Sequence, residues 1–152
     1  MPIPPITEHG YLPPGVHECS LGEAQGYFGV GPARERLWQR FLSYLERIRQ
    51  CGLFVRAIID GRFVSADDEV RDIDVALVPR NLLAEDRDSF RMMTDPQVKR
   101  ELYEDFSVKT YFATNPPVGQ DFTEWFQNIK TKDASRFGSP SDARKGILVV
   151  DL

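Results

Sequence analysis

The chain has 152 residues, of which 41% are hydrophobic and 28% charged. This is the composition of one globular domain and excludes wholesale disorder. Its formal net charge of −4 excludes an overall basic field that would hold nucleic acid, although a local basic patch remains open.

Three absences bear on where the protein works. No apolar run approaches the roughly 18 residues of a membrane span, and the opening Met1–Pro5 lacks the features of a signal peptide. Two cysteines, Cys19 and Cys51, are too few for a disulfide framework. We therefore expect a cytoplasmic protein with free thiols.

The first third of the chain predicts an extended segment and two helices. Residues 1–19 are rich in proline, whose fixed φ angle and missing N–H favour an extended lead-in. Ser20-Leu21-Gly22-Glu23 has the spacing of a capping box, which predicts a short helix through about Phe28. Gly31-Pro32 then places proline in the first turn of a longer amphipathic helix, which Gly52 ends.

Two strands are predicted next. The β-branched and aromatic run Leu53–Ile59 indicates a mostly buried strand that ends at the Asp60-Gly61 turn. A second strand is expected from about Asp72 to Val78. Its apolar tail does not alternate with polar residues, which indicates a sheet covered on both faces.

The rest of the chain continues to alternate helices with strands. We expect a weakly amphipathic helix over 80–93, a helix from Asp95-Pro96 to about Glu104, a strand over Val108–Ala113, a helix over Asp121–Lys132 and a closing strand over Gly146–Leu152. Helices with a few strands between them predict an α/β or α+β fold, with a single domain over 20–152.

Asp72 and Asp74 are the main candidate site residues. Alternate side chains of a strand share a face, so these carboxylates project together, roughly 6.5 to 7 Å apart, while Ile73 points into the opposite layer. A hard divalent cation would relieve their repulsion. Gly61 has no Cβ, so backbone N–H groups at that turn can approach phosphate oxygens. The pattern therefore indicates metal-assisted phosphoryl chemistry.

This pattern resembles the nucleotidyltransferase signature of the polymerase-beta-like superfamily. That signature is an apolar strand, Gly followed by Ser or Gly, and an Asp-apolar-Asp further along the chain. The resemblance implies that Gly61 contacts a nucleoside triphosphate, with ATP first among the candidates, and that Asp72 and Asp74 bind Mg²⁺. It also implies a third carboxylate on a later strand, and a short mixed sheet with helices packed on it.

The resemblance extends over most of the chain. Leu12–Glu18, Ser20–Glu23 and Phe28-Gly29 are similar to the opening of a family of small, uncharacterised bacterial nucleotidyltransferase-like proteins, and Lys145–Val150 to its closing strand. Small proteins of this superfamily often accompany a partner, as in toxin–antitoxin pairs. The resemblance therefore also implies a protein partner in a toxin–antitoxin or defence setting.

Two positions depart from the superfamily pattern. Arg62 stands where the pattern has Ser or Gly, and its guanidinium can either pair with a phosphate or fill the space of a triphosphate. Lys109 or Thr110 falls where the third carboxylate is expected, and neither Asp105 nor Asp121 substitutes for it.

Two functional hypotheses follow from these observations. The first is a minimal Mg²⁺-dependent nucleotidyltransferase that moves a nucleoside monophosphate to a protein or nucleic-acid hydroxyl. In this enzyme Asp72 and Asp74 hold the metal, and Gly61 and Arg62 contact the triphosphate. The second is a catalytically degenerate relative that binds a nucleotide, a nucleic-acid end or a protein partner.

Simpler interpretations stay open as well. Asp72 and Asp74 can pair with Arg71 or another surface cation without any metal. A purely structural interaction domain would bind no nucleotide and would expose an apolar surface around Trp125. Three basic residues flank a Gly-Ser-Pro-Ser loop and either are solvated or contact phosphate: Arg136, Arg144 and Lys145.

Overall fold

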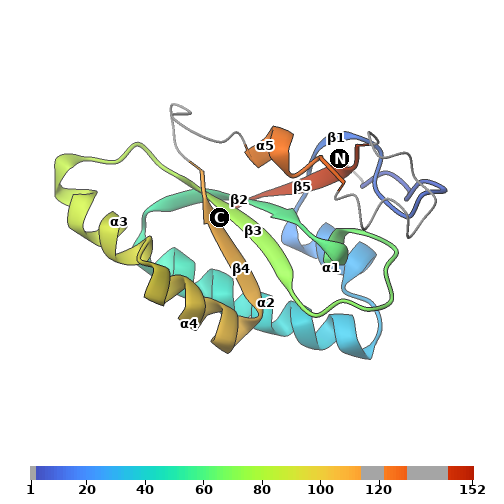
Figure 1. The fold of residues 1–152 in the computed structure, drawn as a ribbon, viewed down its shortest axis with the longest axis horizontal. Coiled ribbons are helices and arrows are strands. Elements are labelled where there is room, and N and C mark those ends of the chain that lie inside the picture. The colour runs from blue at the N-terminus through green and yellow to red at the C-terminus, as the bar shows by residue number, and fades with distance from the viewer. Residues whose placement is uncertain (1–2, 114–121, 130–143) are drawn as a thin grey trace.

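A computed structural model describes residues 3–113, 122–129 and 144–152. Its strands are β1 Gly15–Glu18, β2 Phe54–Asp60, β3 Ile73–Pro79, β4 Val108–Phe112 and β5 Gly146–Asp151. They form one five-stranded sheet in the order β1-β5-β2-β3-β4 (Figure 1). β2 is antiparallel to both neighbours, whereas β1 is parallel to β5 and β4 is parallel to β3. The prediction of an α/β fold with a mixed sheet is confirmed.

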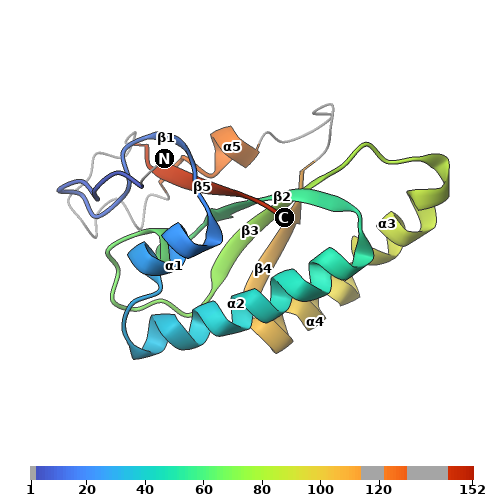
Figure 2. The same ribbon diagram turned by 180° about the vertical axis from the view of Figure 1, so that it is seen from behind.

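Helices cover both faces of this sheet. They are α1 Leu21–Phe28, α2 Pro32–Cys51, α3 Arg87–Met93, α4 Pro96–Phe106 and the single turn α5 Phe122–Trp125, with short 3-10 helices at Arg62–Val64 and Ala84–Asp86. Helices α1, α2 and α4 lie on one side of the sheet and α5 on the other, as the two opposite views show (Figures 1 and 2). Among the described residues, none of the helices combines the length and apolarity that a membrane crossing requires.

Local signals place the first two helices as predicted. The Ser20 hydroxyl accepts a hydrogen bond from the Glu23 amide (3.1 Å), and the Glu23 carboxylate accepts one from the Ser20 amide (3.2 Å), which completes the capping box. Pro32 is the first residue of α2, and Gly52 ends that helix in the left-handed conformation (φ 66°). Cys19 and Cys51 are free thiols, as expected.

The helix predicted over 80–93 is wrong in its first half. The chain forms a 3-10 turn at Ala84–Asp86 before α3 begins at Arg87. The Asp86 carboxylate accepts two hydrogen bonds from the Arg80 guanidinium, both 2.8 Å, and one from the Leu83 amide. These contacts fold the segment back on itself, so a continuous helix cannot form there.

The helix predicted over 121–132 is also shorter, since α5 ends at Trp125. The Gln127 carbonyl accepts a hydrogen bond from the Lys145 amide (2.8 Å), and Asn128 forms an antiparallel bridge with Arg144. Pairing with the segment before β5 therefore replaces further helical turns. Residues 130–132 lie outside the described part of the chain.

Strand β1 lies within the proline-rich segment 1–19 and was not predicted as a strand. It pairs in parallel with β5 at one edge of the sheet, with Gly15 opposite Gly146. The Cys19 amide continues the pairing by donating to the Val149 carbonyl (3.0 Å). The extended lead-in thus contributes an edge strand, which local sequence signals did not reveal.

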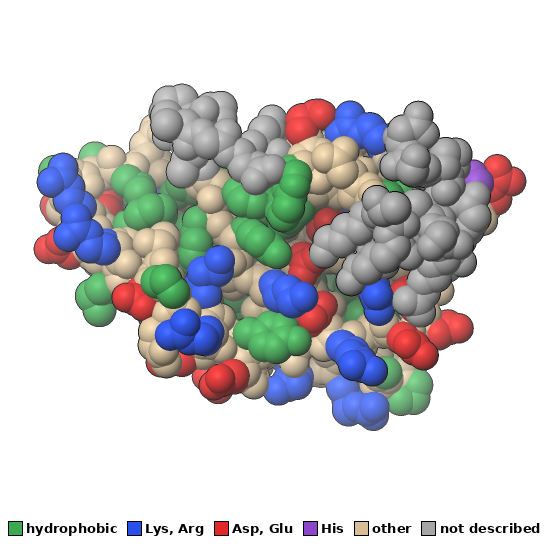
Figure 3. All heavy atoms as spheres, viewed as in Figure 1, with side chains coloured by type: hydrophobic (Ala, Val, Ile, Leu, Met, Phe, Trp, Pro, Cys, Tyr) green, Lys and Arg blue, Asp and Glu red, His purple; other side chains and the backbone are tan. Residues whose placement is uncertain are grey.

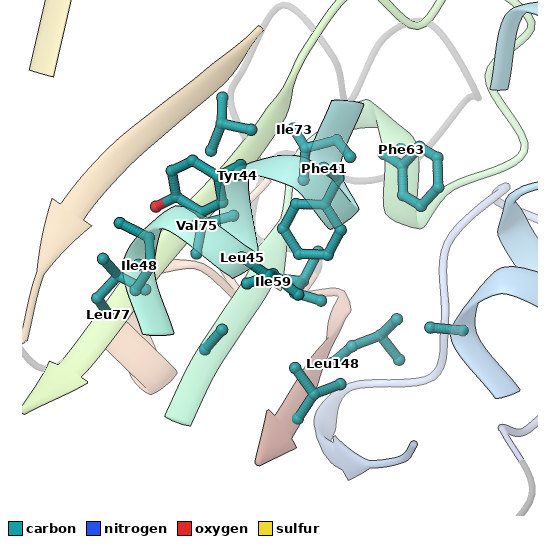
Figure 4. Packing of buried hydrophobic residues seen from close by; sticks show 14 of the residues in the cluster. Phe41, Tyr44, Leu45, Ile48, Ile59, Phe63, Ile73, Val75, Leu77 and Leu148 are labelled. Carbon is teal, nitrogen blue, oxygen red and sulfur yellow. The ribbon is translucent and has the colours of Figure 1, made fainter. Parts of the chain in front are cut away.

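The main core lies between the sheet and α2 (Figure 4). Four fully buried residues of α2 face the strands: Phe41, Tyr44, Leu45 and Ile48. They pack against buried strand residues that include Ile59, Val75, Leu77 and Leu148. A smaller cluster on the opposite face joins Ile58, Ala76, Ile147 and Val149 to Phe126. Burial on both faces explains the apolar, non-alternating strands.

Gly146 offers a test of the β1–β5 edge. A Cβ at this position would collide with the Pro13 carbonyl oxygen and lie 2.6 Å from Nε2 of His17. We expect Gly146→Ala to lower the free energy of unfolding by about 1–3 kcal/mol, the usual cost of overpacking, in urea denaturation.

Gly26→Ala is the matched control. Gly26 lies within α1, and a Cβ there meets nothing within 4 Å. Because alanine favours helix, the free energy of unfolding of this variant should rise by up to about 1 kcal/mol. If both variants were equally stable, the close approach of β1 to β5 would be refuted.

Candidate functional site

The paired aspartates lie where β3 begins. Asp72 immediately precedes the strand and Asp74 is its second residue; both are half-buried, while Ile73 between them is fully buried. Ile73 belongs to the core beneath α2, whereas Ala76, two residues beyond Asp74, belongs to the cluster beneath α5. The carboxylates are therefore on the α5 face of the sheet at its rim, where both residues are half-buried and Oδ1 of Asp74 is enclosed.

The glycine turn lies directly against them. Register places Asp60, the last residue of β2, opposite Asp74, and Gly61 follows with φ 91°. A Cβ on Gly61 would lie 3.3 Å from the carboxyl carbon of Asp74. The tertiary structure thus brings together the turn and the aspartate that the sequence pattern linked.

Lys109 occupies the position at which the resemblance implies a third carboxylate. It pairs with Asp74 in the β3–β4 register, and its Nζ lies 3.6 Å from Oδ2 of Asp72. Burial acts to lower the pKa of Lys109, but the charges of Asp72 and Asp74 outweigh it and raise the pKa above its ordinary value. Thr110, the other candidate, is buried on the opposite face, where its hydroxyl lies 3.0 Å from that of Tyr44.

Arg62 is engaged by its own loop. Its Nε lies 3.6 Å from Oδ2 of Asp67, a carboxylate whose side chain is only 3% exposed. Arg34 of α2 holds the same loop, because its guanidinium donates hydrogen bonds to the carbonyl oxygens of Phe63 (2.7 Å), Ser65 (2.9 Å) and Asp67 (2.8 Å). The core helix α2 thereby fixes the chain that follows Gly61.

An ion pair that the sequence did not reveal completes the site. Nζ of Lys145, just before β5, lies 2.9 Å from Oδ1 of Asp60, and these side chains are 12% and 7% exposed. The ammonium also lies over the ring of Tyr11, 5.8 Å from its centroid. Sequence reasoning assigned Asp60 to a turn and Lys145 to a basic loop. One signal could have indicated this ion pair: carboxylates that lie close together need a nearby cation.

Two other candidates, Asp105 and Arg144, do not join this cluster. Asp105 ion-pairs with Arg47 (3.7 Å), and its carbonyl accepts a hydrogen bond from Arg40, so it belongs to the contact between α4 and α2. Arg144 pairs with the exposed Glu124 (2.9 Å). Asp121 and Arg136 lie outside the described residues.

The residues that the structure describes do not fit a two-metal centre. Within the described ranges, no three or more His, Cys, Asp or Glu side chains are arranged to hold a metal ion. Instead, Lys109 and Lys145 supply positive charge beside Asp72 and Asp60. On the face drawn in Figure 3, acidic and basic side chains lie next to one another near the middle of the molecule. The carboxylates are thus compensated by ammonium groups of the chain itself.

The comparison with known families identifies the chain at family level. Residues 4–151 match a family of unknown function (DUF6932), and the chain belongs to this family. Neither the curated proteins nor the solved structures include a significant match to it. Any activity must therefore be argued from the residues themselves.

The Asp60–Lys145 pair predicts a large effect on stability. Lys145→Met would leave the buried Asp60 carboxylate without its ammonium partner. Removal of one partner of a buried ion pair costs about 3–5 kcal/mol. We therefore expect the free energy of unfolding, measured by chemical denaturation, to fall by that amount. Adding Asp60→Asn should restore much of it.

Arg144→Met is the control for this prediction. It removes a neighbouring cation whose partner Glu124 is largely exposed, so it should cost no more than about 1 kcal/mol. A Lys145→Met variant as stable as Arg144→Met would show that the buried pair is not needed for the fold.

Proposed function

We propose that the chain is a catalytically degenerate nucleotidyltransferase-like domain that binds a nucleotide without a metal ion and acts by occupancy. The observation that carries this proposal is the position of Lys109. Its ammonium pairs with Asp72 and lies opposite Asp74, where a working member of the superfamily is expected to have a carboxylate.

The arrangement of the strands supports the nucleotidyltransferase part of the proposal. An apolar strand, β2, ends in a glycine turn, and the adjacent antiparallel strand β3 carries the Asp-x-Asp residues against that turn. The next strand, β4, is parallel to β3 and begins beside the same carboxylates. The resemblance rests on an apolar strand, a glycine turn and an Asp-x-Asp in that order along the chain, and the contact between the turn and Asp74 supports the proposal.

Electrostatics supports the proposal that the domain is catalytically degenerate. An ammonium group repels a divalent cation at short range, so Lys109 replaces a metal ligand by a group that competes with the metal. The same ammonium can neutralise a phosphate oxygen directly, because lysine binds phosphate as a point charge. Half of its side-chain surface is exposed, which leaves it open to a ligand.

The active nucleotidyltransferase is the second candidate. The half-buried Asp72 and Asp74 beside Gly61 favour it, and it would transfer a nucleoside monophosphate from ATP to a protein or nucleic-acid hydroxyl. A protein partner of the toxin–antitoxin type suits either candidate, and rests on the sequence resemblance alone.

Calorimetric titration separates the candidates. We expect wild-type protein to bind ATP with the same affinity in Mg²⁺ and in EDTA, because the ammonium groups replace the metal. Affinity that requires Mg²⁺, is lost in Asp74→Asn and accompanies transfer of radiolabel to an acceptor would establish the enzyme instead. No binding of ATP under either condition would refute both candidates and favour a structural interaction domain.

A gain-of-function variant tests the role of Lys109. Lys109→Asp places a carboxylate opposite Asp74 and beside Asp72, so we expect it to bind Mn²⁺ at least about tenfold more tightly than wild type, as measured by the electron paramagnetic resonance of free Mn²⁺. Lys109→Met removes the charge without adding a metal ligand, so its affinity for Mn²⁺ should rise much less. If wild type bound Mn²⁺ as tightly as Lys109→Asp, the degenerate assignment would be wrong.

A further inference from the structure

A groove of about 340 Å³ lies between α4 and β4, beside the paired aspartates. The residues that concern the argument are Lys99, Arg100, Tyr103 and Glu104 from α4, and Lys109 and Tyr111 from β4. Its volume is close to the lower end of the range for small-molecule sites, about 300–1,000 Å³. The groove therefore has room for a small ligand.

Two aromatic rings form apolar surfaces in this groove. Tyr103 is 41% exposed, and its hydroxyl donates a hydrogen bond to Oδ2 of Asp72 (3.3 Å), which fixes the position of the ring. Tyr111 packs edge-on against Trp125 and Phe126, with ring centroids 5.7 and 5.5 Å apart. Both rings are held by neighbours, so they offer preformed surfaces on which a planar group can stack.

The charge of the groove favours an anion. Among the lining side chains, Lys99, Arg100 and Lys109 are cationic and Glu104 is acidic, while Asp72 beside the groove pairs with Lys109. Nζ of Lys99 lies over the Tyr111 ring at 5.3 Å from its centroid, and neither Lys99 nor Arg100 forms an ion pair within the described part of the chain. The Arg100 guanidinium donates one hydrogen bond to Oε1 of Gln97, and its other N–H groups are the donors that the proposal assigns to phosphate oxygens.

We propose that this groove is the binding site for a single nucleotide, with the base stacked on Tyr103 or Tyr111 and the phosphates bound by Arg100 and Lys109. This inference rests on the proposed function, since it gives the nucleotide a place and a mode of binding. Stacking and charge pairing are the two contacts that a nucleotide needs and that the groove provides together.

A free nucleotide fits better than a nucleic-acid chain. The groove is small, and the net charge of −4 gives the protein no overall basic field that would hold a phosphate backbone. Lys99, Arg100 and Lys109 lie together in this one groove. We therefore commit to a mononucleotide, and a short oligonucleotide is one arm of the test.

Lys109 connects the groove to the aspartates. Its ammonium lines the groove and also lies 3.6 Å from Asp72, which accepts a hydrogen bond from the Tyr103 hydroxyl. A phosphate that draws Lys109 toward itself competes with Asp72 for the same charge. The paired aspartates therefore set the affinity of the groove without touching the ligand.

Calorimetry with four probes tests the inference: ATP, adenosine, inorganic triphosphate and an eight-residue oligo(dA). Tyr103→Leu removes a stacking surface and should bind ATP at least about fivefold more weakly than Tyr103→Phe, which keeps the ring. Both variants lack the hydroxyl that bonds to Asp72, so they should bind triphosphate alike. Arg100→Gln should weaken both ATP and triphosphate about three- to tenfold. Circular dichroism verifies that each variant is folded.

Matched variants away from the groove provide the controls. Tyr27→Leu changes a tyrosine of similar exposure (38%) on α1, and Arg87→Gln changes an exposed cation on α3; both should bind ATP as wild type does. ATP binding that Tyr103→Leu and Arg100→Gln leave unchanged would overturn the groove and leave the proposed function standing. Absence of ATP binding by wild type would overturn both. Binding of the oligonucleotide but not of ATP would overturn the choice of a mononucleotide.

Discussion

The structure around the glycine turn depends on the compensation of clustered carboxylates by lysines from neighbouring strands. The antiparallel register sets Asp60 of β2 opposite Asp74 of β3, and like charges in such a pair destabilise a sheet. The strand order brings lysines close to these carboxylates. Lys145 reaches Asp60 from the start of β5, the outer neighbour of β2, and Lys109 reaches the β3 carboxylates from β4, the outer neighbour of β3. The cations thus come from both sides of the central pair.

This internal compensation changes what the site can do. A cluster of carboxylates alone would attract divalent cations, whereas one that already contains two ammonium groups has less need of them. Lys109 stays half exposed, whereas Lys145 is nearly enclosed. Under the proposed function, Lys109 binds phosphate and Lys145 stabilises the fold.

The core determines the position of the site as well as its stability. Arg34 on α2 ties the loop after Gly61 to the main core helix through three short hydrogen bonds, and Arg62 is paired within that loop. On the opposite face, the aromatic cluster around Phe126 supports Tyr111. Because helices and strands hold the turn and the groove from both faces, a nucleotide bound as proposed would order few residues of the protein.

The amino-acid sequence by itself determined the elements whose signals are local. The capping box at Ser20 begins α1 and the left-handed Gly52 ends α2, and both helices form as predicted. Apolar runs place β2 and β3 within one residue of their expected bounds. Only the tertiary structure decided which side chains meet. Strand register places Lys109, and not Thr110, opposite Asp74. Register depends on pairing between strands that lie far apart in the chain. The Lys145 contact, the edge strand β1 and the early end of α5 likewise arise from long-range pairing, which no local pattern encodes.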